Sequence, residues 1–86
     1  MARALFNKGV VLGALGRSEE AMAAYDEVVR RIGEAPEAPL REQVANALVN
    51  KGVRLRALDR REEAVAVYDE VVRRIGEAPR RRYARR

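Results

Sequence analysis

Residues 24–36 read AYDEVVRRIGEAP and residues 67–79 read VYDEVVRRIGEAP, so one stretch occurs twice in a chain of 86 residues. The two copies lie 43 residues apart, and the segments before them, residues 2–23 and 45–66, align at the same offset. Over these aligned segments 27 of 35 positions are identical, which chance does not produce. A fixed period of this size is the signature of a repeat architecture, so the chain reads as one supersecondary unit used twice.

The second half of each unit predicts an amphipathic helix. Apolar residues recur with the four-three-four spacing of one helix face at Ala21, Tyr25, Val28 and Ile32. The second copy repeats that spacing at Ala64, Tyr68, Val71 and Ile75. Ser18 stands where an N-cap is expected in the first copy, and Asp59, or else Arg60, stands there in the second. Gly33, followed by Pro36, is a helix stop.

The first half of each unit predicts another helix, which is longer in the second copy. Pro39 suits its first turn, and its buried stripe is expected at Leu40, Val44, Ala47, Leu48, Leu55 and Leu58. The first copy lacks a counterpart of residues 39–44, so we expect about 13–14 helical residues there against about 19–20. Gly9 and Gly52 lie in mid-helix, where glycine costs about 1 kcal/mol relative to alanine. They predict that another helix approaches closely; the alternative is a tolerated weak point.

These elements give an all-α protein of about four helices in two tandem antiparallel hairpins. Residues 1–36 form the first repeat, with a shortened first helix, residues 37–79 form the second, and residues 80–86 form a basic tail. The predicted core draws on both hairpins, at Leu5, Leu12, Leu15, Ala21, Tyr25, Val28, Leu48, Leu55, Leu58, Ala64, Tyr68 and Val71. Ion pairs four residues apart are expected on the outer face of the first copy's second helix, at Asp26–Arg30 and Glu27–Arg31.

The composition excludes several kinds of site. The chain has no cysteine and no histidine, which removes thiolate catalysis and a structural zinc site. Its hydroxyl groups have no histidine as a base, and neither a glycine-rich phosphate loop nor a loop of clustered acids is present. We therefore predict no enzyme activity, cofactor or metal. The N-terminus does not read as a signal peptide and no stretch is long enough to span a membrane, so we expect a cytoplasmic protein.

The net charge of +5 is concentrated in the last seven residues. Residues 1–79 hold 13 basic and 13 acidic residues, whereas residues 80–86 hold five arginines and no acid. Arginines neutralise phosphates, and Tyr83 offers a ring for stacking on a base, so nucleic acid or an anionic surface is a possible partner of the tail. The alternatives are a solvated tail without a ligand, or a terminal stub in which Tyr83 covers the end of the last hairpin.

A pattern of small and aromatic residues runs through both copies. It comprises Leu5, Gly9, Leu12, Gly16, Ala21 and Tyr25, and then Leu48, Gly52, Leu55, Ala64 and Tyr68. In these positions the chain resembles a tetratricopeptide repeat, in a longer variety of bacterial type. Its period exceeds the roughly 34 residues of the family, the extra length falls in residues 34–44, and Asp59 replaces a turn glycine. The resemblance implies a fragment of an α-solenoid that serves as a protein-interaction or scaffold module.

The resemblance also implies a concave binding face lined by the first helix of each hairpin. Mapped onto this chain, that face consists of Arg3, Phe6, Asn7, Val10, Asn46, Val49, Asn50, Val53 and Arg56. An asparagine amide both donates and accepts, so it can pair with the backbone of a protein or peptide partner. The alternative is that these amides only cap or solvate a helix. Capture of a terminal carboxylate is not expected, because Phe6 and Val10 stand where the family needs Lys and Asn.

Self-assembly into a homo-oligomer is a further hypothesis. Helical repeats bury their core against neighbouring repeats, and about three are usually needed for stability. This chain holds two, and the exposed face of one copy should fit the other because the two surfaces are nearly the same. End-to-end stacking, or exchange of the long first helix between chains, would satisfy that complementarity.

Overall fold

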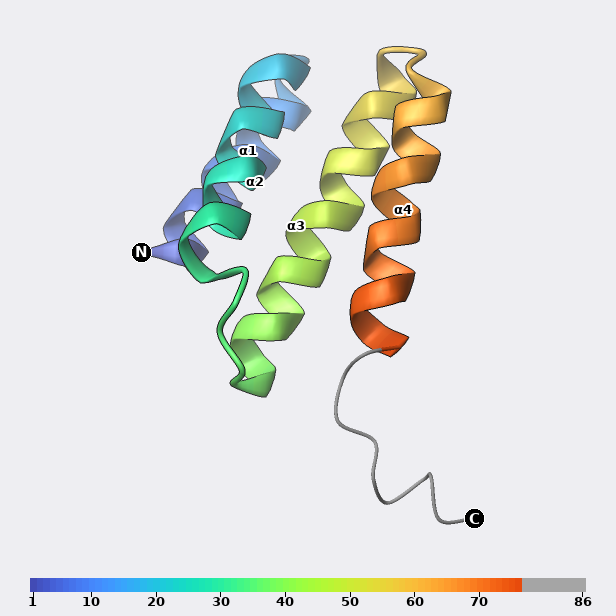
Figure 1. Ribbon diagram of the computed structural model, residues 1–86. Helices are drawn as coiled ribbons and strands as arrows, with labels where there is room; N and C mark the ends of the chain where they lie inside the picture. The colour runs from blue at the N-terminus through green and yellow to red at the C-terminus, as the bar shows by residue number, and fades with distance from the viewer. Residues whose placement is uncertain (77–86) are drawn as a thin grey trace.

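Four helices joined by short turns make up residues 1–76, which are the residues that the structure, a computed structural model, describes (Figure 1). They are α1 (Ala2–Ala14), α2 (Ser18–Ile32), α3 (Ala38–Ala57) and α4 (Arg61–Gly76). The predicted all-α fold is therefore confirmed. The first helix is short in the first hairpin, at 13 residues, and long in the second, at 20 residues, as predicted. Pro39 lies in the first turn of α3.

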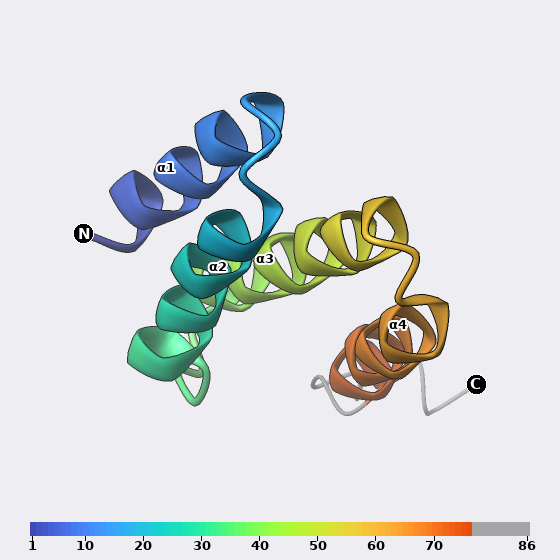
Figure 2. The ribbon, with the colours of Figure 1, turned by 90° about the horizontal axis from the view of Figure 1, so that it is seen from above.

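The helices form two hairpins that stack against each other. Helix α1 pairs with α2 and α3 pairs with α4, while α2 also packs against α3, and α1 touches α3. Seen from above, α1 and α4 lie at opposite ends of the stack, with α2 and α3 between them (Figure 2). Helix α3 contacts all three other helices, so its position fixes how the two hairpins are arranged.

The core runs through the stack as groups of apolar side chains shared between neighbouring helices. Around Tyr25 it joins α1, α2 and α3, and Ala47 of α3 is fully buried in this group. Val44 and Leu48 of α3 pack with Val71 of α4 and with the end of α2. The residues predicted for the core are buried or half-buried, with two exceptions.

The two exceptions are leucines at the surface. Leu15 is 64% exposed and Leu58 is 37% exposed. Each is the C-cap residue of the first helix of its hairpin. The chain turns there toward the next helix, so the buried stripe that holds Leu12 and Leu55 does not continue to the residue three positions later. Apolar spacing predicted the stripe correctly but not the residue at which it ends.

A tyrosine ring lies directly against a glycine in each hairpin. A Cβ atom on Gly9 would stand 2.9 Å from Cζ of Tyr25, and one on Gly52 would stand 2.7 Å from Cζ of Tyr68. Bonded neighbours aside, carbon atoms do not approach so closely, so only glycine lets the two helices of a hairpin meet at this distance. The predicted close approach is confirmed in both copies, and a merely tolerated weak point is not the explanation.

The turn between the helices of each hairpin has the same hydrogen bonds in both copies. The N–H of Arg17, and likewise that of Arg60, donates to the carbonyl five residues earlier, at 2.9 and 2.8 Å. The residue before each is left-handed, with a φ of 78° at Gly16 and 62° at Asp59. This is the Schellman ending of a helix, which glycine adopts freely and aspartate adopts with strain.

Two of the predicted N-caps, Ser18 and Asp59, are wrong, whereas the alternative in the second copy, Arg60, occupies the position directly before α4. Ser18 is the first residue of α2, and no side-chain cap hydrogen bond is present. Its hydroxyl oxygen instead accepts a hydrogen bond from Arg54 Nη1 of α3 at 3.3 Å. Asp59 occupies the left-handed turn position, and α4 begins at Arg61, so the alternative, Arg60, precedes the helix. A partner on another helix and the turn geometry decide these positions, and neither is visible in a local pattern.

A lysine of α3 binds the acid that was predicted to pair within α2. Lys51 Nζ donates to Asp26 Oδ1 at 2.8 Å, so the predicted pair of Asp26 with Arg30 does not form. Arg30 contacts Glu27 instead, and the predicted pair of Glu27 with Arg31 is present at 2.6 Å. Asp26 pairs with Lys51 and not with Arg30, because α3 places the ammonium group of Lys51 directly beside the Asp26 carboxylate.

Arg60 and Arg54 add further polar contacts between the hairpins. Arg60 Nη1 donates to Glu19 Oε2 at the start of α2, at 3.2 Å. Arg54 Nη1 donates to the carbonyl of Gly13 at 3.1 Å. A Cβ atom on Gly13 would lie 3.2 Å from Cδ of Arg54, so the missing side chain leaves the room that this arginine uses.

We predict that Gly52→Ala lowers the free energy of unfolding by about 1–2 kcal/mol. Overpacking against Tyr68 costs more than the gain in helix propensity returns. Urea unfolding followed by far-ultraviolet circular dichroism measures the change. Gly76→Ala is the matched control, because a Cβ atom there meets nothing within 4 Å. Equal effects of the two substitutions would show that the contact with the tyrosine does not matter.

Candidate functional site

The nine residues that the sequence predicts to meet a partner all lie on α1 and α3, and we call them the first-helix face. They are Arg3, Phe6, Asn7, Val10, Asn46, Val49, Asn50, Val53 and Arg56. Phe6 and Asn50 are half-buried, and the other seven are exposed. Helix α1 touches α3, and equivalent positions of two stacked repeats project alike, so the two rows face the same side of the molecule.

The asparagines of the first-helix face have unused hydrogen-bonding groups. Within residues 1–76 the side chains of Asn7, Asn46 and Asn50 form no hydrogen bond with another residue. Each amide carries one acceptor oxygen and two donor hydrogens. All three residues lie inside a helix and not at its end, so they do not act as caps. Their amides are available to solvent or to a partner.

Apolar side chains alternate with these amides. Val10, Val49 and Val53 are 36–44% exposed. The ring of Phe6 rests on that of Tyr25, with 5.8 Å between ring centroids and an angle of 48° between the planes. Such a tilted pair holds the phenylalanine in one orientation. The face therefore offers both apolar contact area and backbone-pairing groups.

The first-helix face is positively charged at its two ends. Arg3 lies in the first turn of α1 and Arg56 in the last turn of α3. Among the described residues neither arginine has an acidic partner, and the face contains no acid. Gln43, one turn before Asn46 on α3, has a buried carbonyl oxygen without a hydrogen-bond partner in the same part of the chain. The sequence pattern did not single out this glutamine.

One acidic residue in the first turn of α2, and one in the first turn of α4, is paired with an arginine of the preceding turn. Arg17 donates to Glu20 at 2.5 and 2.9 Å, and this hydrogen bonding lowers the pKa of the Glu20 carboxyl. Arg60 binds Glu63 in the same way and lowers the pKa of that carboxyl. The negative charges of Glu20 and Glu63 are balanced by these neighbouring arginines, so they do not offset the positive charge at the ends of the first-helix face.

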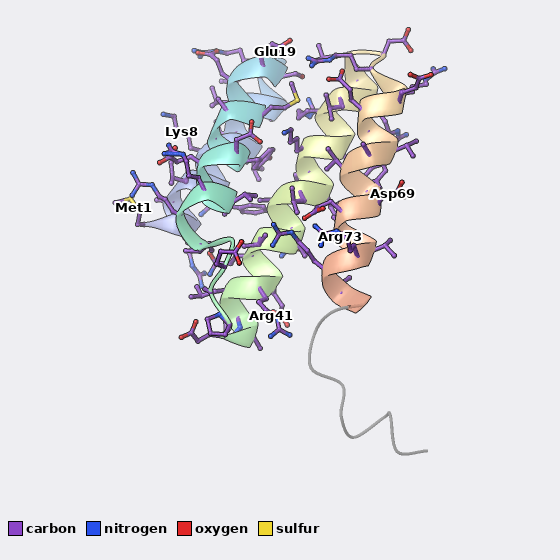
Figure 3. The ribbon with its side chains drawn as sticks, in the orientation of Figure 1. Met1, Lys8, Glu19, Arg41, Asp69 and Arg73 are labelled. Carbon is purple, nitrogen blue, oxygen red and sulfur yellow. The ribbon has the colours of Figure 1, made fainter. Side chains whose placement is uncertain are left out.

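Two hollows in the described surface lie away from the first-helix face. One, of about 430 Å³, lies between α2, α3 and α4, and its Asp26, Lys51 and Arg60 already pair across the junction. The other, of about 500 Å³, lies where the α2–α3 connection meets the end of α4. Its Arg41, labelled in Figure 3, and its Arg74 each donate to a backbone carbonyl. We assign neither hollow to a ligand.

Two kinds of site are missing from residues 1–76. No helix there is long and apolar enough to cross a membrane. No group of three or more acidic residues in this part of the chain is placed to hold a metal ion. The basic tail of residues 80–86, with Tyr83, lies outside the described residues, so its binding to nucleic acid stays a prediction.

Comparison with known families agrees with the geometry. Family models described as tetratricopeptide repeat match residues 2–33 and residues 44–78, which together make up most of the chain. The chain therefore belongs to the tetratricopeptide repeat family. Repeats of this family are generally protein–protein interaction modules. Searches among curated proteins and among solved structures gave no match.

Sequence reasoning missed the side chains that join the two hairpins. Lys51 was not connected with Asp26, because the two are 25 residues apart and no helical spacing relates them. A signal was nevertheless present, since both residues recur one period away, as Lys8 and Asp69. A charged pair that is repeated in both members points to a repeated contact.

We predict that Asn50→Ala changes the free energy of unfolding by less than about 0.5 kcal/mol, because its amide has no partner in the fold. Arg54→Ala, four residues later on the same helix, should cost about 1.5–3 kcal/mol, because it removes charged hydrogen bonds to Gly13 and Ser18. Urea unfolding compares the two. A comparable loss in Asn50→Ala would mean that the asparagine serves folding.

Proposed function

We propose that this chain binds an extended segment of a partner protein on the first-helix face. The observation that carries the proposal is the set of unpaired amides of Asn7, Asn46 and Asn50 beside exposed apolar side chains. Solvation alone calls for polar residues on such a surface and not for valines among them. Membership of a family whose repeats are generally interaction modules supports the same conclusion.

The chemistry of the face suits a peptide backbone. An extended segment presents an N–H and a C=O at every residue, and an asparagine amide can donate to one and accept from the other. Every second side chain of the extended segment points to the same side, where Val10, Val49 and Val53 provide apolar contact. Phe6 is already oriented by Tyr25, so little conformational freedom is lost when a partner covers it.

The charges of the face define the partner further. Arg3 and Arg56 lie at its two ends and have no acidic partner among the described residues. We therefore propose a segment with apolar residues in its middle and Asp or Glu on its flanks. A terminal carboxylate is not required, because Phe6 and Val10 stand where a clamp for that group would need Lys and Asn.

We predict that the full chain, used as bait for a random peptide display library, selects peptides with an apolar middle and acidic flanks. Resynthesised peptides, labelled with a fluorophore, give a Kd by fluorescence anisotropy. Asn50→Ala should weaken that Kd at least about tenfold, because a peptide group loses its hydrogen bonds on binding.

Val65→Ser on α4 is the control for this experiment. It alters an exposed apolar residue that is remote from the first-helix face, so the Kd of the selected peptides should stay unchanged. Peptides that lose affinity for Val65→Ser and bind Asn50→Ala normally would place the binding surface elsewhere. A library that yields no enriched peptide would count equally against the proposal.

A further inference from the structure

The outer face of α4 is an apolar surface that no other helix of residues 1–76 covers. We call it the α4 end face, and it consists of Val65, Tyr68, Asp69, Val72 and Ile75. Val72 is 69% exposed, whereas its equivalent in α2, Val29, is half-buried against α3. Met22, the equivalent of Val65, is buried with Leu55 of α3. The α4 end face is therefore equivalent in position to the surface of α2 that packs against α3.

The outer face of α1 is its counterpart at the other end of the stack. This α1 end face consists of Met1, Ala4, Lys8 and Val11. The equivalents of its first two residues in α3, Val44 and Ala47, are 2% and 0% exposed because they take part in the packing against α2. In α1 both positions are exposed, and Met1 is 80% exposed. Figure 3 shows Met1 and Lys8 on one side of the molecule and Asp69 on the other.

The two residues of the ion pair at the α2–α3 junction have equivalents on the two end faces, one on each. Inside the chain Lys51 of α3 binds Asp26 of α2 at 2.8 Å. Lys8 and Asp69 are the same two residues one period away. Within residues 1–76 neither of them forms an ion pair. The α1 end face thus has the lysine, and the α4 end face has the aspartate, that are equivalent to the Lys51–Asp26 ion pair.

A second ion pair between the hairpins, that of Arg60 with Glu19, also has equivalents at the two ends. Arg60 binds the glutamate three residues later through Nε and Nη2, and its Nη1 reaches Glu19 of the other hairpin at 3.2 Å. Arg17 holds the glutamate three residues later through the same two nitrogens, and its Nη1 has no partner in the described part of the chain. The equivalent of Glu19 is Glu62, which is likewise without an ion pair there.

We propose that a second copy of this chain covers the α4 end face, with its α1 packed there as α3 packs on α2. Lys8 of one copy then pairs with Asp69 of the next, and Arg17 pairs with Glu62. The occupant is a second copy because both halves of the internal junction, apolar and charged, are without a partner within residues 1–76 and lie at opposite ends of the four-helix stack. This surface is distinct from the first-helix face, so the inference does not rest on the proposed function.

The junction between copies is heterologous, which has a consequence for assembly. Each copy keeps one free α1 end face and one free α4 end face, so association continues into open stacks and does not stop at a dimer. The contact is weaker than the internal one, because Val11 replaces Arg54 and its hydrogen bonds are lost. It also lacks the covalent connection that holds α2 and α3 at high effective concentration.

We predict that sedimentation velocity of the full chain shows a mass that rises steadily with protein concentration. Lys8→Glu should lower the association constant at least about tenfold, because it places a carboxylate opposite Asp69. Asp69→Lys should have the same effect for the opposite reason. Arg3→Glu is the matched control: it makes the same change of charge on the same helix, but on the first-helix face, and should leave the association constant unchanged.

Mixing the two charge-reversed chains tests the geometry. The new carboxylate of Lys8→Glu can meet the new ammonium group of Asp69→Lys, and the unchanged Lys8 of the second chain can meet the unchanged Asp69 of the first. An equimolar mixture should therefore form stacks of alternating chains that neither chain forms alone. A contact between two α4 faces would respond to the change at Asp69 and not to the change at Lys8, and that result overturns the proposal. So does a chain that stays monomeric at every concentration.

The outcomes separate this proposal from the proposed function. Peptide binding depends on Asn50 and should survive Lys8→Glu and Asp69→Lys, whereas self-association depends on those two residues and should survive Asn50→Ala. Loss of either activity alone therefore leaves the other proposal standing.

Discussion

The packing of α2 against α3 is the interaction on which the rest of the structure depends. Within each hairpin a tyrosine packs against a glycine, and apolar side chains such as Leu12 with Ala21, or Leu55 with Ala64, join the two helices. Ala47 and Val44 of α3 become fully or almost fully buried in the packing that joins the hairpins. The same contact holds α1 next to α3, so it also makes one continuous surface out of two separate rows of side chains.

Much of this fold follows from the sequence, because a duplicated pattern shows twice which positions matter. Helix number, helix length and the close approach at Gly9 and Gly52 were predictable, since each depends on local spacing or on a glycine that recurs. The caps were not, because Ser18 bonds to an arginine on another helix. The exposure of Leu15 was not predictable either, because spacing does not show where a stripe ends.

The candidate site was predictable only in part. The resemblance to a family named the positions on α1 and α3, but only the structure shows that Asn50 has no partner within the described residues. The ionic contacts between hairpins were not predicted, because Lys51 and Asp26 are related by the stacking of helices and not by helical spacing, and only the recurrence of both residues pointed to a repeated contact. The duplication predicts that the two ends resemble the two sides of the internal junction, and the structure places Lys8 and Asp69 there without an ion pair within residues 1–76.

The first helix of each hairpin thus uses different sides for different contacts. The glycine side of the first helices meets the tyrosines and holds each hairpin together. The asparagine side is left free of internal hydrogen bonds, and the third side joins one hairpin to the next. At the outer sides of α1 and α4 the corresponding surface has no neighbour within the described chain, and for this reason we propose the same contact between molecules.

Cross-linking through introduced cysteines tests this central claim most directly, because the chain has no cysteine of its own. Chains carrying Lys8→Cys and chains carrying Asp69→Cys are mixed, treated with a short bismaleimide and digested for mass spectrometry. The account predicts that links between positions 8 and 69 of different chains clearly outnumber links between two like positions. A product dominated by 69–69 or 8–8 links, or no product above that of cysteines placed at Arg3, would contradict it.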